Sequence, residues 1–339
     1  MKPPVRPVYP ATAAARDRWI LQQRGERVPI DLWRPQGWFV EAEAAGRAAG
    51  QVSVLTVLLS SRECPWRCLM CDLWRHTSAD AVPPGAIPAQ IEVALRDPAV
   101  RTARPPVIKL YNSGSFLDPL AVPPIDYPQI ATQLEGFERV IVECHPGLIG
   151  PRLGAWQAAL AGIDGSPPRL EVAMGLETAH RDTLERLNKR ITLEGFRRAA
   201  GRLRARGVDL RAFVLVRPPF LDPSAALEWA VRSADFAFDC GAGAVTLIPT
   251  RAGNGALEAL AAAGAFAEPD LSLLEAALEA GLALGRGRVF ADLWDLDRFA
   301  RCHLCFQERR HRLEIMNLTQ RIQPQIWCGD CGEAVAAPR

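Results

Sequence analysis

Six apolar runs in the middle of the chain alternate with segments of helical periodicity, and this alternation is the strongest constraint on the fold. The expected strands are residues 52–59, 107–111, 139–142, 170–174, 210–216 and 244–248. The expected helices are residues 87–95, 127–134, 151–161, 181–187 with 193–206, and 223–240. Continuously apolar strands are covered on both faces, which is typical of parallel β/α units. The sequence therefore predicts an α/β fold, a partial (β/α)6 barrel with its site at the carboxyl ends of the strands.

The segments on either side of this pattern predict smaller additions to the barrel. Helices are expected over residues 11–23 and 35–49, and again over residues 256–284, with a strand within 288–296. The predicted organisation is an N-terminal extension (1–50), the barrel (51–255), a helical and strand extension of the core (256–300) and a four-cysteine tail (301–339).

Composition excludes some classes of protein. The 339 residues carry a net charge of +2, so overall charge makes no case for or against nucleic acid. No run reaches the roughly 20 apolar residues of a membrane span, and residues 1–10 lack the apolar core of a secretory signal. We therefore expect a cytoplasmic chain without a membrane partner, in which nine cysteines are metal ligands or thiols before disulfides.

Three cysteines follow the first apolar run closely. Cys64, Cys68 and Cys71 have the spacing C-x3-C-x2-C. Three thiolates on one short loop can bind three irons of a 4Fe–4S cluster and leave the fourth iron open to a small molecule. A partial zinc site or unrelated core thiols are the alternative. The arrangement resembles the cluster loop of the radical S-adenosylmethionine (SAM) enzymes, which implies one-electron cleavage of SAM to a 5′-deoxyadenosyl radical.

Polar residues follow the later strands where each strand ends. They are Asn112, Ser113 and Gly114 after the second strand, Glu143 after the third, Glu177 and Lys189 after the fourth, and Arg217 after the fifth. Because these strand ends meet at one edge, we expect these residues to bind SAM. Glu143 can accept from an ammonium or a ribose hydroxyl, and Glu177 is a candidate for the ribose hydroxyls. Arg217 suits a carboxylate or phosphate, and Lys189 either the SAM carboxylate or a helix C-terminus. His145 is expected to hydrogen-bond within its loop.

These stretches, in this order behind the cysteine loop, are similar to one branch of the radical SAM enzymes. The similar stretches are residues 111–118, 143–146, 174–189 and 215–221. The branch contains the Elongator catalytic subunit, MiaB and NifB, and the chain most resembles the radical SAM subunit of archaeosine synthase. The resemblance covers roughly residues 50–260. It implies the partial barrel, SAM, hydrogen bonds from the 112–114 turn to the methionyl amino group, a one-electron donor such as ferredoxin or flavodoxin, and a modified nucleoside or tRNA as substrate.

Two further cysteine pairs near the C-terminus predict a second metal site. Cys302 and Cys305 form one C-x2-C pair, and Cys328 and Cys331 form the other. Four thiolates on two such turns build a closed tetrahedral zinc site, and an auxiliary iron–sulfur cluster is the alternative. Arginines between the pairs, within residues 308–321, are either RNA phosphate contacts or a solvated helix face.

The sequence leaves three functions open. The first is a radical SAM enzyme that abstracts hydrogen from a modified nucleoside or tRNA. The second is a radical SAM enzyme that acts on a small metabolite or peptide. The third, from a different class, is a non-catalytic RNA-binding scaffold with a structural iron–sulfur cluster; the open three-cysteine set argues against it, because a structural cluster is normally closed by a fourth ligand. The oligomeric state is not determined by the sequence.

Overall fold

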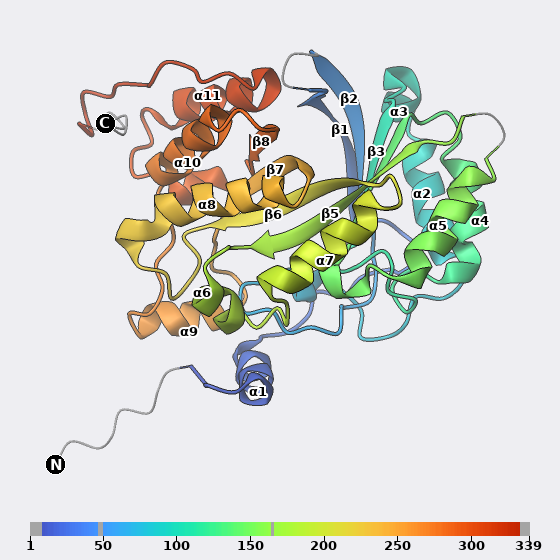
Figure 1. Cartoon of the computed structure of the whole chain (residues 1–339), viewed down its shortest axis with the longest axis horizontal. Coiled ribbons are helices and arrows are strands. Elements are labelled where there is room, and N and C mark those ends of the chain that lie inside the picture. The colour runs from blue at the N-terminus through green and yellow to red at the C-terminus, as the bar shows by residue number, and fades with distance from the viewer. Residues whose placement is uncertain (1–8, 47–49, 164–165, 333–339) are drawn as a thin grey trace.

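A single curved sheet organises the computed structural model, which describes residues 9–46, 50–163 and 166–332 (Figure 1). Its strands, in spatial order, are β1 (Gly37–Ala44), β2 (Gln51–Leu58), β3 (Val107–Tyr111), β4 (Arg139–Glu143), β5 (Arg169–Glu177), β6 (Asp209–Val216), β7 (Ala242–Pro249) and β8 (Arg288–Ala291). Strands β2 to β8 are parallel, and β1 is antiparallel to β2. The six predicted strands correspond to β2 to β7, and the predicted partial barrel is confirmed.

Helices cover the outer face of this sheet. They are α2 (Ala86–Leu95), α3 (Pro98–Ala103), α4 (Tyr127–Gln133), α5 (Pro151–Ala161), α6 (Arg181–Arg186), α7 (Leu193–Arg204), α8 (Ala226–Asp239), α10 (Leu271–Ala283) and α11 (Phe306–Thr319). Helices α1 (Ala13–Gln23) and α9 (Ala256–Ala262) lie together below the sheet in Figure 1. Alternate strand residues such as Val140, Val172 and Val214 point into the main core under the helices. Among the described helices, none is both long and apolar enough to cross a bilayer.

The helix predicted over residues 35–49 is wrong. Residues Gly37–Ala44 form β1, which pairs with β2 from Gly37 opposite Leu58 to Ala44 opposite Gln51. Alanine and glutamate in this segment favour a helix, but Trp38, Phe39 and Val40 favour a strand. The free edge of β2 decides between the two, because backbone pairing there satisfies a full row of donors and acceptors.

A buried ion network fills the end of the barrel away from the strand carboxyl ends. Arg211 on β6 lies 2.5 Å from Glu43 on β1 and 2.7 Å from Glu171 on β5. Lys109 on β3 lies 2.7 Å from Glu43. Burial alone would raise the pKa of Glu43, but the Arg211 and Lys109 charges hold it far below its usual range. The network thus ties four strands together by charge in addition to their backbone ladders.

The two edges of the open sheet meet through side chains. Arg288 on β8 lies 3.3 Å from Glu43 on β1 and donates to the Ala44 carbonyl at 3.1 Å. The outer edge of β8 is capped by two amide side chains from the end of α11. Gln320 and Asn317 each donate to and accept from the backbone of β8, at distances of 2.7 to 2.9 Å. An edge that would otherwise be open to strand pairing is closed in this way.

Arg211→Met should lower the free energy of unfolding by about 3–5 kcal/mol, because it removes the cation that two buried carboxylates, Glu43 and Glu171, share. Urea denaturation measures the change. The matched control is Arg232→Met, which removes an exposed pair with Glu228 at 2.8 Å and should leave stability nearly unchanged. Equal effects of the two substitutions would contradict the role given to the network.

Candidate functional site

The loop that carries Cys64, Cys68 and Cys71 follows β2 and is held by segments that follow β5 and β7. The backbone N–H of Leu69 donates to the Leu187 carbonyl at 2.9 Å. The Asn188 amide donates to the Arg67 carbonyl at 2.7 Å, and the Asn254 amide donates to the Leu69 carbonyl at 2.6 Å. Both asparagines were missed in the sequence; the only signal for Asn254 was its place between two glycines. The cysteine loop, which follows β2, is therefore fixed by residues that follow β5 and β7.

The three thiols are in protected positions. Cys68 is buried, and Cys64 and Cys71 are half-buried. Burial raises the pKa of Cys68 to about 12, while the positive charge of Lys189 acts in the opposite direction. Such thiols become thiolates when a metal displaces the proton.

An arginine clamp holds the start of this loop against the N-terminal segment. Glu63 lies 2.7 Å from Arg24 and 3.1 Å from Arg67, and it also pairs with Arg27. Burial would raise the pKa of Glu63, but these hydrogen bonds and charges hold it low. The predicted polar extension is thus part of the site, which the sequence alone did not reveal.

Helix α1 completes this contact. Ile20 belongs to a small apolar cluster with Leu69 of the cysteine loop and Leu257 of α9. A Cβ on Gly255, whose φ is +84°, would lie 1.9 Å from the Gln23 carbonyl oxygen. Only glycine lets the end of α1 approach the segment after β7 so closely.

The predicted turn after β3 lies directly beside the cysteines. The Glu143 carboxylate at the end of β4 accepts from the N–H groups of Asn112 at 2.6 Å and Gly114 at 3.3 Å. Burial raises the pKa of Glu143 to about 7, although these N–H groups lower it. A Cβ on Gly114 would lie 3.6 Å from the Cys64 Cβ. The Asn112 side-chain oxygen is buried without a partner among the described residues, so it remains available to a ligand.

Glu177 and Lys189 form a buried ion pair with each other, at 2.7 Å. Burial would lower the pKa of Lys189, but Glu177, Cys68 and Cys64 together raise it, so the ammonium faces two of the cysteines. A Cβ on Gly175 would lie 2.2 Å from the Glu177 carboxylate and 2.5 Å from the Lys189 nitrogen. The contacts predicted between this pair and SAM stay predictions, as does that of Ser113.

Unusual backbone conformations gather at the same strand ends. Positive φ angles occur at Ser113 (56°), Glu177 (68°), Asn188 (58°), Arg217 (56°) and Phe220 (70°). Such conformations cost roughly 1–3 kcal/mol each and cluster at functional sites. The Arg217 guanidinium donates to the Glu268 carbonyl at 3.0 Å, and its predicted role toward an anion also stays a prediction.

His145 hydrogen-bonds within its loop, as predicted from the sequence. One ring nitrogen lies 3.0 Å from the donating Gly147 N–H, and the other lies 2.9 Å from the Lys189 carbonyl. Its ring stacks on Trp66, between the first two cysteines, at 3.5 Å. Burial and the Lys189 charge lower the pKa of His145 to about 3. A neutral imidazole thereby links β4, the cysteine loop and Lys189.

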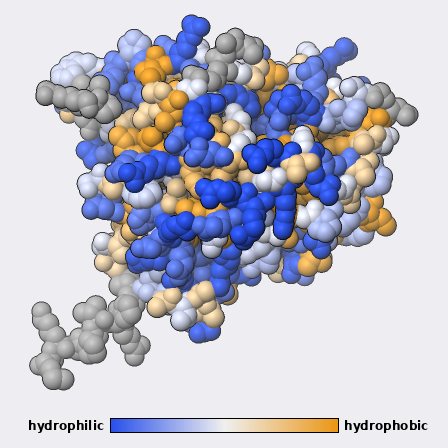
Figure 2. Space-filling view, in the orientation of Figure 1, coloured by the Kyte–Doolittle hydropathy of each residue, from blue (hydrophilic) through white to orange (hydrophobic). Residues whose placement is uncertain are grey.

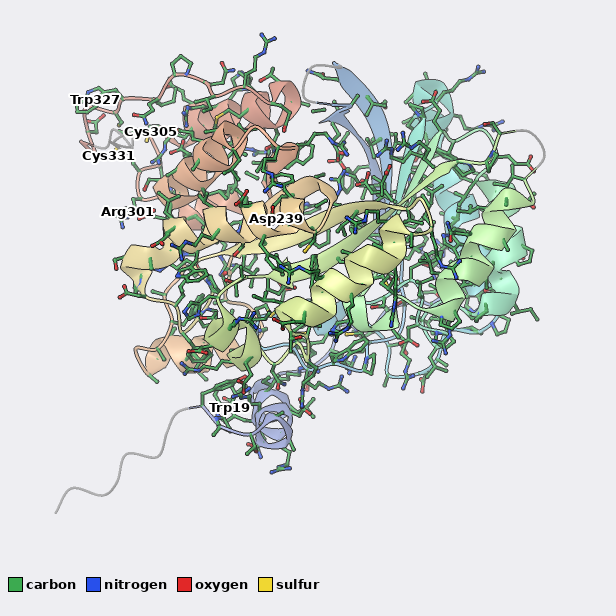
Figure 3. The ribbon with its side chains drawn as sticks, viewed as in Figure 1. Trp19, Asp239, Arg301, Cys305, Trp327 and Cys331 are labelled. Atoms are coloured by element: carbon green, nitrogen blue, oxygen red, sulfur yellow. The ribbon has the colours of Figure 1, made fainter. Side chains whose placement is uncertain are left out.

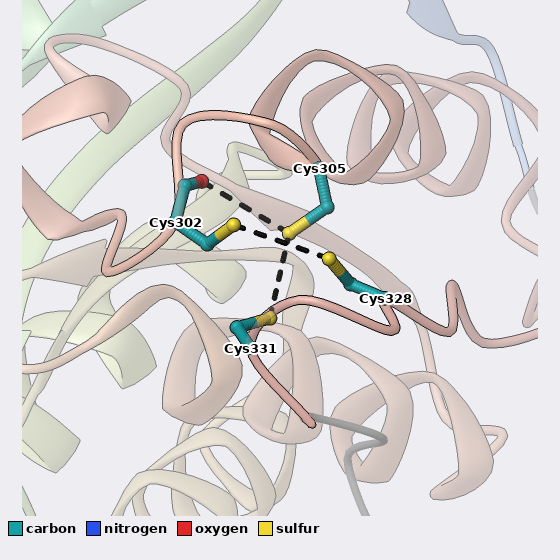
Figure 4. A group of neighbouring side chains, drawn as sticks. All are labelled: Cys302, Cys305, Cys328 and Cys331. Atoms are coloured by element: carbon teal, nitrogen blue, oxygen red, sulfur yellow. Dashed lines mark hydrogen bonds between the residues drawn. The ribbon is translucent and has the colours of Figure 1, made fainter.

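The four C-terminal cysteines meet around one point (Figure 4). Their sulfurs all lie within 4.8 Å of one another, with Cys302 to Cys328 and Cys305 to Cys331 both at 4.0 Å. Backbone N–H groups lower the pKa of Cys302 to about 7. In Figure 3 the labelled Cys305 and Cys331 lie at the opposite end of the molecule from Trp19 of α1.

Two of the arginines between these cysteine pairs are not available to RNA, contrary to one of the two alternatives for this stretch. Arg309 is buried 2.6 Å from Glu275, and Arg312 is buried 2.5 Å from Glu279. Both belong to α11 and fasten it to α10. Sequence spacing could not show this, because the carboxylates lie more than 30 residues away.

Gly175→Ala should force Glu177 and Lys189 apart and lower the free energy of unfolding by about 3–5 kcal/mol, as expected when a buried pair is broken. Gly201→Ala is the control, since a Cβ there meets nothing within 4 Å in the middle of α7. That control should be neutral or stabilise by about 0.5–1 kcal/mol. A wild-type denaturation curve for Gly175→Ala would refute the steric argument.

Comparison with known proteins gives relatives over the barrel region. No protein-family model matches the chain. The archaeosine synthase subunit beta of Methanosarcina acetivorans is 31% identical over 196 residues, covering 55% of this chain and 54% of the relative. The protein of the same name from Thermococcus kodakarensis is 28% identical over 137 residues, covering 39% and 41%. The chain thus spans about half the length, or less, of these curated relatives.

Among solved structures, the archaeal Elp3 of Methanocaldococcus infernus has a TM-score of 0.46 and 12% identity, covering 62% of this chain and 55% of that one. In this chain a C-x3-C-x2-C loop lies on a parallel partial barrel. The chain is similar in sequence, over that barrel region, to the archaeosine synthase beta subunits.

Proposed function

We propose that this chain is an enzyme that binds a 4Fe–4S cluster and SAM and abstracts hydrogen from a modified nucleoside of tRNA. The observation that carries the proposal is the C-x3-C-x2-C loop after β2, held by Leu187, Asn188 and Asn254 from the segments that follow β5 and β7. The names of the relatives, subunits of an archaeosine synthase, support a nucleoside substrate.

The residues around the loop fit these two groups. Three cysteines leave one iron of a cluster without a protein ligand, and such a cluster, once reduced, supplies the electron that cleaves SAM. The Asn112 side-chain oxygen and the Glu143 carboxylate offer acceptors to the amino group of SAM, close to Cys64. The Lys189 ammonium offers a charge to the SAM carboxylate, and Glu177 offers an acceptor to hydroxyls.

The surroundings also exclude water and hold protons in place. Leu69 beside the cysteines is fully buried, and the barrel interior beneath carries Tyr111 and Phe213 in edge-to-face contact. The His145 ring, whose pKa burial lowers, positions the loop through its contacts with Gly147, the Lys189 carbonyl and Trp66. A donor of single electrons, such as ferredoxin or flavodoxin, completes the requirements of this proposal.

Anaerobically reconstituted protein should release 5′-deoxyadenosine from SAM on chemical reduction, measured by chromatography. Cys68→Ala should abolish the release, because it removes one of only three cluster ligands. Cys240→Ala is the matched control, since that cysteine is also buried but lies at the end of α8. If the protein carries a complete cluster and still leaves SAM intact, the proposal is wrong.

The substrate is tested by nucleoside profiles of tRNA from a strain that lacks the gene. We expect one modified nucleoside to disappear and its precursor to accumulate. An unchanged profile would favour a small metabolite or peptide instead.

For the four-cysteine site we propose zinc. Four thiolates bound to one zinc at about 2.3 Å and tetrahedral angles lie about 3.8 Å apart, close to the spacing of these sulfurs. Thiolates that each bind a different iron of a cluster are spread further, around the whole cluster.

The variant Cys64→Ala, Cys68→Ala, Cys71→Ala should therefore retain one zinc per chain and no iron by elemental analysis. Because α11 begins at this site and caps β8, chelation of the zinc should also lower the thermal midpoint. Iron in that variant would favour an auxiliary cluster.

A further inference from the structure

We propose that six arginines on α5, on α7 and in the turn after α7 bind the phosphate backbone of the RNA substrate, along a surface that leads away from the barrel mouth. We name them the arginine strip: Arg152, Arg197, Arg198, Arg202, Arg204 and Arg206. All six are exposed. The inference rests on the proposed function, since it names the surface that would hold that substrate.

The two segments that carry the strip lack carboxylates. Residues 146–163 and 195–208 contain no aspartate or glutamate. Several exposed arginines elsewhere have carboxylate partners, such as Arg96 with Glu92 at 2.5 Å and Arg232 with Glu228 at 2.8 Å. Within the described residues, no member of the strip forms an ion pair with a carboxylate. The whole chain is nearly neutral, so this local excess of positive charge is not a consequence of composition.

The fold gathers these arginines on one surface. Helix α7 buries Phe196, Ala200 and Leu203 and turns its arginines to solvent. The Arg202 guanidinium donates to the Ile149 carbonyl just before α5, at 2.8 Å. A Cβ on Gly154 of α5 would lie 3.2 Å from the Arg206 guanidinium. Figure 2 shows strongly hydrophilic side chains across the face where Figure 1 places α6 and α7.

The direction of the strip connects it to the site. Helix α7 follows β5 after α6, so it begins on the side of the mouth and runs toward the opposite end, where β6 begins. Its 12 residues span about 18 Å, the reach of several successive phosphates. A cavity of about 330 Å³ lies at the far end and is lined by Arg169, Arg204, Gly207, Cys240 and Gly241 together with Asp209, whose carboxylate pairs with Arg169 at 3.0 Å.

The chemistry of the strip favours RNA over other polyanions or partners. Guanidinium groups recognise phosphate through paired N–H donors. Among the described residues from 146 to 206, no large apolar side chain is exposed, whereas protein interfaces centre on such side chains. The apolar side of α7 is packed in the core, so the helix has no free apolar face for a membrane. Contacts to phosphate position an RNA without reading its sequence.

The test measures binding of an unmodified tRNA transcript by fluorescence anisotropy at several KCl concentrations. The variant Arg198→Gln, Arg204→Gln, Arg206→Gln removes three charges from the strip. The control Arg96→Gln, Arg232→Gln, Arg310→Gln removes three exposed arginines that have carboxylate partners. Both lose the same net charge, so any difference between them is local.

We expect the strip variant to bind tRNA at least about tenfold more weakly near 0.1 M salt, and its slope of log Kd against log salt to fall by about 2–3, or 0.7–0.9 per lost contact. The control should bind like wild type. Both should still cleave SAM on chemical reduction. Equal tRNA binding by both variants, or no tRNA binding by wild type, would overturn the inference. Loss of SAM cleavage in every protein would instead count against the proposed function.

Discussion

A buried network of charges at the closed end of the barrel is the constraint on which the rest of the structure depends. Arg211, Glu43, Glu171 and Lys109 come from four strands and neutralise one another where water is absent. Burying such charges is costly unless every partner is present, so the network favours only the register in which all four meet. With Arg288 it also draws the two sheet edges together and gives the sheet the curvature that makes a mouth.

At the mouth of the barrel the backbone adopts strained conformations, and hydrogen bonds between neighbouring loops hold it in place. The cysteine loop has no regular structure over its cysteines, and its shape comes from Asn188, Asn254 and the Leu187 carbonyl. Positive φ angles at non-glycine residues recur at the ends of β3, β5 and β6. Strain of this kind persists only when the surroundings over-determine it. The buried ion network at one end of the barrel is therefore rigid, and the polar groups at the strand carboxyl ends are held in positions where they can bind a ligand.

Much of this arrangement was predictable from local patterns. The apolar runs predicted β2 to β7 to within three residues at each end, because parallel strands buried on both faces leave a clear signal. The turn at 112–114 and Glu143 were expected to meet at one edge, and they hydrogen-bond there. Two features were not predicted. The first is β1, where the helix and strand propensities of the residues conflict. The second is the role of α1, because the residues at its end contact Glu63 and Gly255, about 40 and 230 residues away.

The sequence by itself determined the class of fold and predicted two sets of cysteine ligands, because cysteine spacing and strand periodicity are local properties of the chain. Only the tertiary structure decided how the arginines divide. Arg309 and Arg312 are buried ion pairs of α11, Arg24 and Arg27 clamp the cysteine loop, and six others face solvent without carboxylates. The sequence does not show whether an arginine is paired with a carboxylate. The role of an arginine depends on whether folding brings a carboxylate beside it, and that is fixed by contacts between residues far apart along the chain.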